Sequence, residues 1–111
     1  MPRSARSALA RPASIFAALG DKTRLGLVLR LSNDGPMSIT QLAAGFAITR
    51  QAVTKHLRVM EGAGLVRRRR HGRESRWQLD QKRLVDARRH LETISAHWDQ
   101  TLDRLKHLVE Q

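Results

Sequence analysis

The sequence contains no cysteine and no tyrosine, and only two phenylalanines and two tryptophans. The missing cysteines exclude disulfides, thiolate metal sites and cysteine nucleophiles, and the scarcity of aromatic side chains argues against RNA recognition by base stacking. No apolar run approaches the ~20 residues that span a bilayer, so we expect a cytoplasmic protein that does not enter a membrane. No glycine-rich phosphate loop and no cluster of acid, base and nucleophile is visible, so we expect neither an enzyme nor a bound cofactor.

Acidic residues are scarce relative to basic ones. The chain has 21 Lys and Arg against 10 Asp and Glu, a net charge of +11, and 17 of the 21 cations are arginine. Residues 49–76 alone carry nine cations and two acids, which is +7 of the total. Arginine suits phosphate and guanine recognition, and charge gathered in one segment is typical of a surface that contacts a polyanion. The alternative is an ordinary solvated basic face.

The chain divides into three parts. Residues 1–13 combine Arg, Ser, Ala and Pro without an acid, which predicts a flexible basic arm. Residues 14–79 predict four short helices and then a β-hairpin, because capping residues precede apolar residues spaced three and four apart. The expected caps are Ser14, Asp21, Ser38 and Thr49, and the hairpin wing over 66–79 turns at His71-Gly72-Arg73. Residues 80–111, capped by Asp80, predict one long helix, so the fold class is mainly α with a β-hairpin wing.

The last helix carries a heptad stripe. Leu84, Leu91, Trp98 and Leu105 follow a seven-residue repeat, with further residues at the intermediate positions. A helix of ~30 residues is about 45 Å long, which is more than a domain of ~80 residues can cover. The stripe therefore predicts a homodimer in which a second copy covers it. The alternative is a helix that folds back on its own domain.

The fourth helix and the hairpin hold the candidate site. Two short helices joined by a tight turn and followed by a basic hairpin predict a winged helix-turn-helix, with the recognition helix over about 49–62 in a DNA major groove. Arg50 suits guanine and Gln51 suits adenine, because these pairs form bidentate hydrogen bonds. Strand alternation sends only half of the run Arg67–Arg70 to one face, and Arg73 at the turn suits the minor groove or a phosphate. The candidate DNA-binding residues are Thr49, Arg50, Gln51, Thr54, Lys55, His56, Arg58, Arg69 and Arg73.

Three segments in this order resemble one known family. The segments are LGDKTRL at 19–25, TRQAVTKHL at 49–57 and MEGAGLV at 60–66. They are similar to the opening, the recognition helix and the exit into the wing of ArsR-type (ArsR/SmtB-like) winged helix-turn-helix repressors. A dimer with two recognition helices about 34 Å apart predicts a partly palindromic operator. The resemblance implies a homodimeric, mostly helical, DNA-binding transcriptional repressor with the first and last helices in the dimer interface. The interface residues expected on this basis are Ile15, Phe16, Leu19, Leu84, Leu91, Ile94, Trp98, Leu102 and Leu105.

The sequence departs from the metal-sensing members of that family. Their thiolate motif would fall near residues 41–45, which contain no metal ligand. Their zinc motif on the last helix is matched only by His97, His107 and Glu110; its aspartate is missing, and a gap one residue short rotates the second pair by about 100°. His90 and His97 share a face beside the leucine stripe, where we expect interface or surface histidines. We therefore expect no metal site, and no residue identifies another effector.

Two other classes of function fit the composition less well. The basic face of a winged helix can also bind an acidic protein partner, and equal binding to heparin and to any DNA duplex would favour this interaction module. A small RNA-binding protein is the other class, and it lacks the surface aromatics that such recognition uses.

Overall fold

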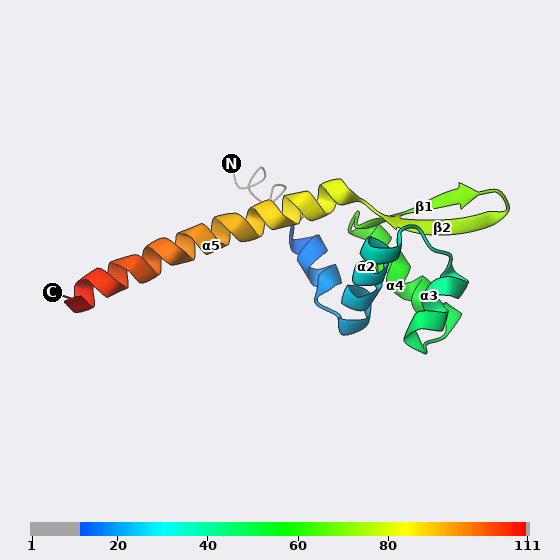
Figure 1. Cartoon of the computed structure of the whole chain (residues 1–111), viewed down its shortest axis with the longest axis horizontal. Coiled ribbons are helices and arrows are strands. Elements are labelled where there is room, and N and C mark those ends of the chain that lie inside the picture. The colour runs from blue at the N-terminus through cyan, green and yellow to red at the C-terminus, as the bar shows by residue number, and fades with distance from the viewer. Residues whose placement is uncertain (1–11, 111) are drawn as a thin grey trace.

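The computed structural model describes residues 12–110. Residues 12–19 are helical (the N-terminal helical segment), and α2 (Lys22–Asp34), α3 (Ile39–Phe46), α4 (Arg50–Gly62), β1 (Val66–His71), β2 (Glu74–Leu79) and α5 (Gln81–Glu110) follow (Figure 1). Pro12 and Ala13, which were predicted to end the arm, are helical, and Pro12 is buried. Ser14 therefore lies inside a helix rather than at its N-cap, and the rest of the predicted arm lies outside the described residues.

Side-chain caps begin the remaining helices as the sequence predicts. An Asp21 carboxylate oxygen accepts a hydrogen bond from the backbone N–H of Arg24 at 3.0 Å. Ser38 forms a capping box with Gln41, and the Thr49 hydroxyl accepts from the N–H of Ala52 at 3.0 Å. These bonds satisfy N–H groups that a helix end otherwise leaves without a partner, so each helix begins at a defined residue.

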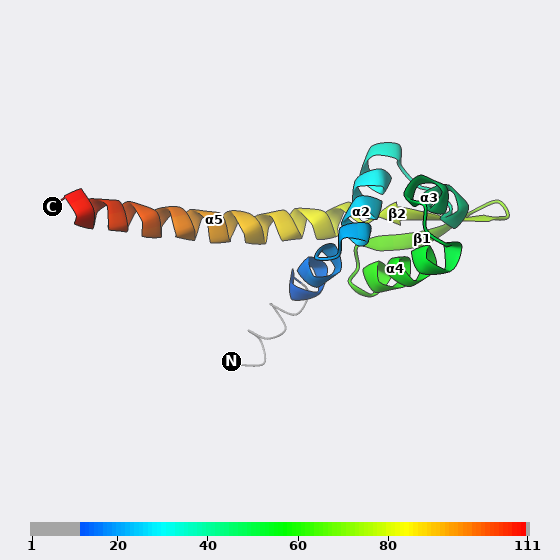
Figure 2. The same ribbon diagram turned by 90° about the horizontal axis from the view of Figure 1, so that it is seen from below.

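The core lies where α2, α3 and α4 meet the base of the hairpin. The side chains of Leu27, Leu42, Leu57, Met60 and Leu65 are fully buried there. Figure 2 shows α4 next to β1, whereas α2 and α3 lie across the hairpin from α4 in this view. The core therefore holds α4 by its inner face and leaves its outer face free.

The turn between α3 and α4 is tight and closely packed. Ala47, at the C-cap of α3, adopts a left-handed conformation with φ +53°, and α4 begins three residues later. Gly26 on α2 allows close approach of α3, since a Cβ there would lie 2.7 Å from Cε1 of Phe46. This packing sets how closely α2 and α3 approach each other beside the turn.

The wing is a two-stranded antiparallel hairpin. Val66 pairs with Leu79 at its base and His71 with Glu74 at its tip, so Gly72 and Arg73 form the two-residue turn, as predicted. Gly72 has φ +64°, which is the positive φ that the first central position of such a turn requires. A backbone bridge between Met37 and Trp77 joins the second strand to the segment before α3.

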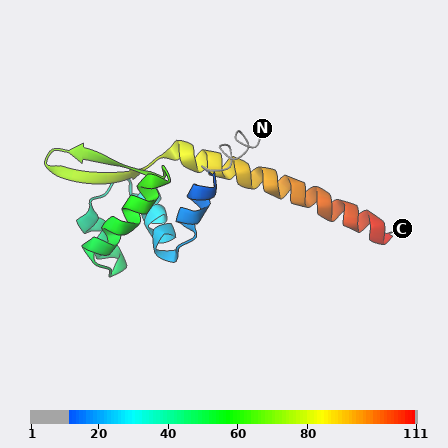
Figure 3. The ribbon, with the colours of Figure 1, turned by 180° about the vertical axis from the view of Figure 1, so that it is seen from behind.

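Helix α5 extends far beyond the rest of the molecule. The radius of gyration is 18.3 Å and the longest extent is 67 Å, whereas a compact chain of this length has a radius of about 13 Å. Figure 3 shows the hairpin, α3 and α4 at one end and the C-terminus of α5 at the other. Ala87 is the only buried residue of α5. No helix in the described part of the chain is long and apolar enough to cross a membrane.

Candidate nucleic-acid interface

The outer face of α4 forms one side of an open groove. Val53, Leu57 and Met60 turn inward at spacings of three and four, so the polar residues between them face out. The groove has a volume of about 630 Å³. It is lined by Arg50, Gln51, Thr54, Lys55 and Arg58 from α4 and by Ile39 from the first turn of α3. The structure thus brings five of the predicted DNA-binding residues together, and it adds Ile39, a half-buried residue that also packs against the core.

Two predicted threonines already make hydrogen bonds within the helix. Thr49 accepts from Ala52 as the N-cap, and the Thr54 hydroxyl donates to the carbonyl oxygen of Arg50 at 2.8 Å. Thr49 keeps its hydroxyl proton for donation, whereas Thr54 keeps only lone pairs for accepting. A phosphate suits Thr49, and a base amino group suits Thr54.

His56 lies apart from the groove. Its Nδ1 is 3.9 Å from the Asp21 carboxylate at the start of α2, and its side chain is 25% exposed. The pKa of Asp21 is lowered, chiefly by the hydrogen bond from the backbone N–H of Arg24; desolvation opposes this shift, and the charges of Arg24 and His56 add to the lowering. His56, which the sequence suggested as a DNA-binding residue, therefore contacts the N-cap of α2, and the helical spacing of α4 alone does not reveal this contact.

The arginines of the wing have different partners. Arg67 donates two hydrogen bonds to one Asp80 oxygen, at 3.3 and 3.1 Å, and the Asp80 side chain is only 13% exposed. Burial raises the pKa of Asp80, but the hydrogen bonds and charge of Arg67 and the backbone N–H of Lys82 outweigh it, so the pKa is lowered. Arg76 pairs with Glu74 at 3.0 Å. Arg67 and Arg76 are thus used within the fold.

The other cations of the two elements remain uncompensated. Within residues 12–110, the following make no ion pair: Arg50, Lys55, Arg58, Arg68, Arg69, Arg70 and Arg73. Arg69 shares a face with Arg67, whereas Arg68 and Arg70 share the opposite face with Trp77, as the strand register requires. The groove and the hairpin lie at the same end of the molecule (Figure 3), so these charges form one cationic end.

The predicted interface residues fall into three groups. Leu91, Ile94, Trp98, Leu102 and Leu105 are exposed on α5. Phe16, Leu19 and Leu84 are half-buried against the core. Ile15 is 1% exposed and belongs to the same core cluster as Ala87 of α5, so its side chain offers almost no surface to a second copy.

The described residues contain no group of three His, Cys, Asp or Glu side chains placed to hold a metal ion. Nδ1 of His107 instead lies 2.9 Å from the carbonyl oxygen of Asp103 in its own helix. The absence of a metal response stays a prediction for this chain.

Known proteins resemble this chain in architecture and in sequence. Residues 19–69 match the family model of a helix-turn-helix domain. The chain is 33% identical over 99 residues to the HTH-type transcriptional regulator Rv2034 of Mycobacterium tuberculosis, and the match covers 89% of each chain. It is 36% identical to the solved ArsR-like transcriptional regulator from Rhodococcus sp. RHA1, with a TM-score of 0.80 over 92% of this chain and 95% of that one.

A third comparison shows the same fold at lower identity. The homodimeric winged helix-turn-helix DNA-binding domain of Mb0332 from Mycobacterium bovis is 22% identical, with a TM-score of 0.65 over 89% of this chain and 90% of that one. Three observations indicate the same class of protein: the winged helix-turn-helix fold, the uncompensated cationic end, and relatives that match over most of their length. The chain belongs to the ArsR family of DNA-binding transcriptional regulators.

Proposed function

We propose that this regulator is a homodimeric repressor that binds a partly palindromic operator. The observation that carries the proposal is the groove in which Arg50, Gln51 and Arg58 lie together on the free face of α4. Arg50 and Gln51 stand in the first turn of that helix, the part of a recognition helix that reaches base edges. Arg50 is assigned to guanine and Gln51 to adenine.

The remaining cations are assigned to the DNA backbone. Lys55 and Arg58 lie further along α4, and Arg69 and Arg73 lie on the wing, where contact with phosphates gives affinity without sequence preference. Each phosphate contact contributes a slope of about −0.9 to the dependence of log affinity on log salt. Affinity therefore falls steeply as salt rises.

Dimerisation is inferred from α5. Its second half exposes a row of large apolar side chains, including Trp98 at 62% and Leu105 at 53% exposure. A second copy of the same helix covers such a row by symmetry, and the Mb0332 domain with the same fold is homodimeric. Two recognition helices then enter successive major grooves about 34 Å apart, which makes the operator partly palindromic. Where that operator overlaps a promoter, the bound dimer excludes the polymerase.

The test is selection of DNA fragments by the purified protein, followed by affinity measurements on the selected operator. We expect the selected sequences to contain two inverted half-sites one helical turn apart. Arg50→Ala and Gln51→Ala should each relax base preference at one position per half-site, with a cost of roughly 1–3 kcal/mol. Arg104→Ala, which removes the same charge from the exposed far end of α5, is the matched control and should leave base preference unchanged.

Two results would contradict the proposal. Unchanged discrimination between operator and scrambled DNA in both α4 variants would show that α4 does not read the bases. Selected sequences without inverted symmetry would show that the protein does not bind as a two-fold dimer.

A further inference from the structure

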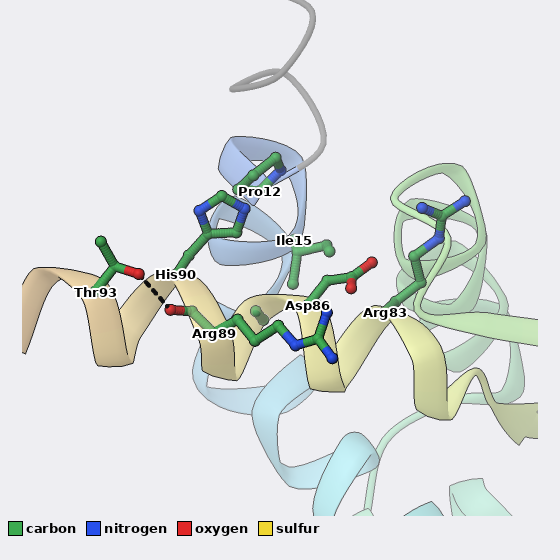
Figure 4. A pocket seen from close by; sticks show the side chains of 8 residues that line it. Pro12, Ile15, Arg83, Asp86, Arg89, His90 and Thr93 are labelled. Carbon is green, nitrogen blue, oxygen red and sulfur yellow. Dashed lines mark hydrogen bonds between the residues drawn. The ribbon is translucent and has the colours of Figure 1, made fainter.

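A pocket separate from the cationic end lies between the N-terminal helical segment and the first half of α5. It has a volume of about 390 Å³, within the range of small-molecule sites. Its apolar floor is formed by Pro12, Ile15 and Ala87, all of them buried. Figure 4 shows Pro12 and Ile15 on one side and the α5 side chains on the other, with the ring of His90 beside Pro12.

The rim of this pocket carries charged side chains that have no ion-pair partner among the described residues. Arg83, Asp86 and Arg89 line it, and none of them makes an ion pair or side-chain hydrogen bond with another described residue. Arg88 is not among the residues that line the pocket, and it pairs with Glu92 at 3.3 Å. Two arginines and one aspartate leave one net positive charge, which matches a monoanion.

We propose that this pocket binds a small organic carboxylate with a short apolar chain. The guanidinium groups of Arg83 and Arg89 bind the carboxylate, since arginine donates paired hydrogen bonds to that group. The apolar chain lies along the floor formed by Pro12, Ile15 and Ala87; because these side chains are already buried, the apolar gain comes from the hydrocarbon surface that the ligand itself removes from water. Asp86 disfavours a second negative charge on the ligand, so a monocarboxylate binds better than a dicarboxylate.

The apolar row of α5 leaves this pocket open in the proposed dimer. Given 100° per residue, Asp86, His90 and Thr93 lie roughly 80–160° around the helix from Leu91 and Trp98, whereas Ala87 on the pocket floor lies within about 40° of them. A partner helix on the apolar row therefore leaves the side of the pocket formed by Asp86, His90 and Thr93 uncovered.

Arg83 connects the pocket to the DNA-binding elements. A Cβ added to Gly64 would lie 3.0 Å from Nε of Arg83, so the arginine side chain runs across the turn between α4 and β1. Figure 4 shows Arg83 directed toward that end of α4. A carboxylate that draws the guanidinium group into the pocket changes this contact and thereby the position of the wing relative to α4. By linkage, DNA and carboxylate then change each other's affinity; this second step rests on the proposed function, whereas the binding itself does not.

The first experiment measures binding of hexanoate to the full chain without DNA, by calorimetry and by amide chemical shifts. We expect saturable binding at one site per protomer, with shifts at residues of the pocket. Arg83→Gln and Arg89→Gln should each weaken binding at least tenfold, and Arg88→Gln, the matched control, should bind as the wild type does. Hexan-1-ol and acetate should each bind at least tenfold more weakly, because one lacks the charge and the other the chain. Thermal melting of each variant checks that it is folded.

Several results would overturn the site. No saturable hexanoate binding would do so, as would an equal loss in the Arg88 variant or equal affinity for the alcohol. Acetate binding as tightly as hexanoate would reduce the pocket to a simple anion site and would overturn its apolar part.

The second experiment measures operator affinity with and without saturating hexanoate at constant ionic strength. We expect a change of at least fivefold in the wild type and none in the Arg83 variant. Hexanoate that fills the pocket without any change in operator affinity would overturn the coupling. A wild-type protein that binds no operator even without hexanoate would instead overturn the proposed function, and it would leave the result of the first experiment intact.

Discussion

Replacement of Trp98 by aspartate should separate the proposed dimer into monomers. Trp98 lies on α5 with Ile94 one turn before it and Leu102 one turn after it, and these three side chains are 62%, 60% and 48% exposed. The described residues of the same chain leave roughly half of each of these residues exposed. A tryptophan at this place is therefore expected at the centre of the contact between two copies of α5.

The size of the effect follows from the exposed area. A large aromatic side chain buries about 200 Å² when fully covered, so the 62% that is exposed corresponds to about 120 Å². At about 25 cal/mol per Å² this area contributes about 3 kcal/mol in each protomer, and a two-fold dimer loses it twice. The dissociation constant of the dimer should rise at least roughly a hundredfold, even if the contact covers only half of this area. The new carboxylate adds a desolvation cost in the same direction.

Sedimentation equilibrium over a wide range of protein concentration measures this change. The wild type should have twice the chain mass of 12.6 kDa, and the variant should approach the mass of one chain. Gln100→Asp is the matched control, since Gln100 is exposed on the same helix but lies away from the apolar row, and it should remain dimeric. A Trp98 variant with the dimer stability of the Gln100 variant would refute the assignment of the apolar row to the interface.

Three further predictions concern the wing, its anchor and metals. Arg73→Ala should weaken binding to all duplexes alike and reduce the salt slope by about 0.9 in a fluorescence anisotropy series, because Arg73 is assigned to a phosphate; a loss confined to the operator would contradict this. Asp80→Asn should lower the free energy of unfolding by about 1 kcal/mol at neutral pH, because it removes the charge that caps α5 and pairs with Arg67. The folded state lowers the pKa of Asp80, so its stabilisation is complete above the unfolded pKa and is lost as the pH falls through the folded value. Urea unfolding should therefore show the difference between wild type and variant shrinking in acid, and a constant difference would be evidence against the ion pair. Zn²⁺ and Cd²⁺ should leave operator affinity unchanged, and a loss that a chelator reverses would reveal a metal site.

Local patterns in the sequence were sufficient to predict most of the fold. The caps at Asp21, Ser38 and Thr49 depend only on residues within the next turn of chain, so they could be read directly. The hairpin turn at Gly72 is local for the same reason. Ser14 was wrong as a cap because Pro12 is buried beside α5, a contact between segments that are distant in sequence.

The candidate site was predicted less completely, because several of its residues depend on packing between elements. The face of α4 follows from helical period alone, and its five groove residues were expected. Ile39 enters the groove because of the angle between α3 and α4, and His56 turns toward Asp21 because α2 packs nearby. The spacing of residues along the chain predicts neither the angle between α3 and α4 nor the position of α2. The same holds for Ile15, whose burial requires the position of α5.

The pair Arg67–Asp80 links the wing, which we assign to DNA binding, to α5, which we assign to the dimer interface. Asp80 accepts from Arg67 on β1 and caps α5, and its backbone N–H donates to the carbonyl oxygen of Leu65 at 2.8 Å, just before β1. The side chain and the backbone N–H of Asp80 therefore each hold the start of α5 against the base of the wing. If two α5 helices pair along the apolar row, their crossing angle also fixes the separation of the two wings. We therefore expect the charge of Arg67 to affect DNA binding through the position of the wing rather than through contact with a phosphate.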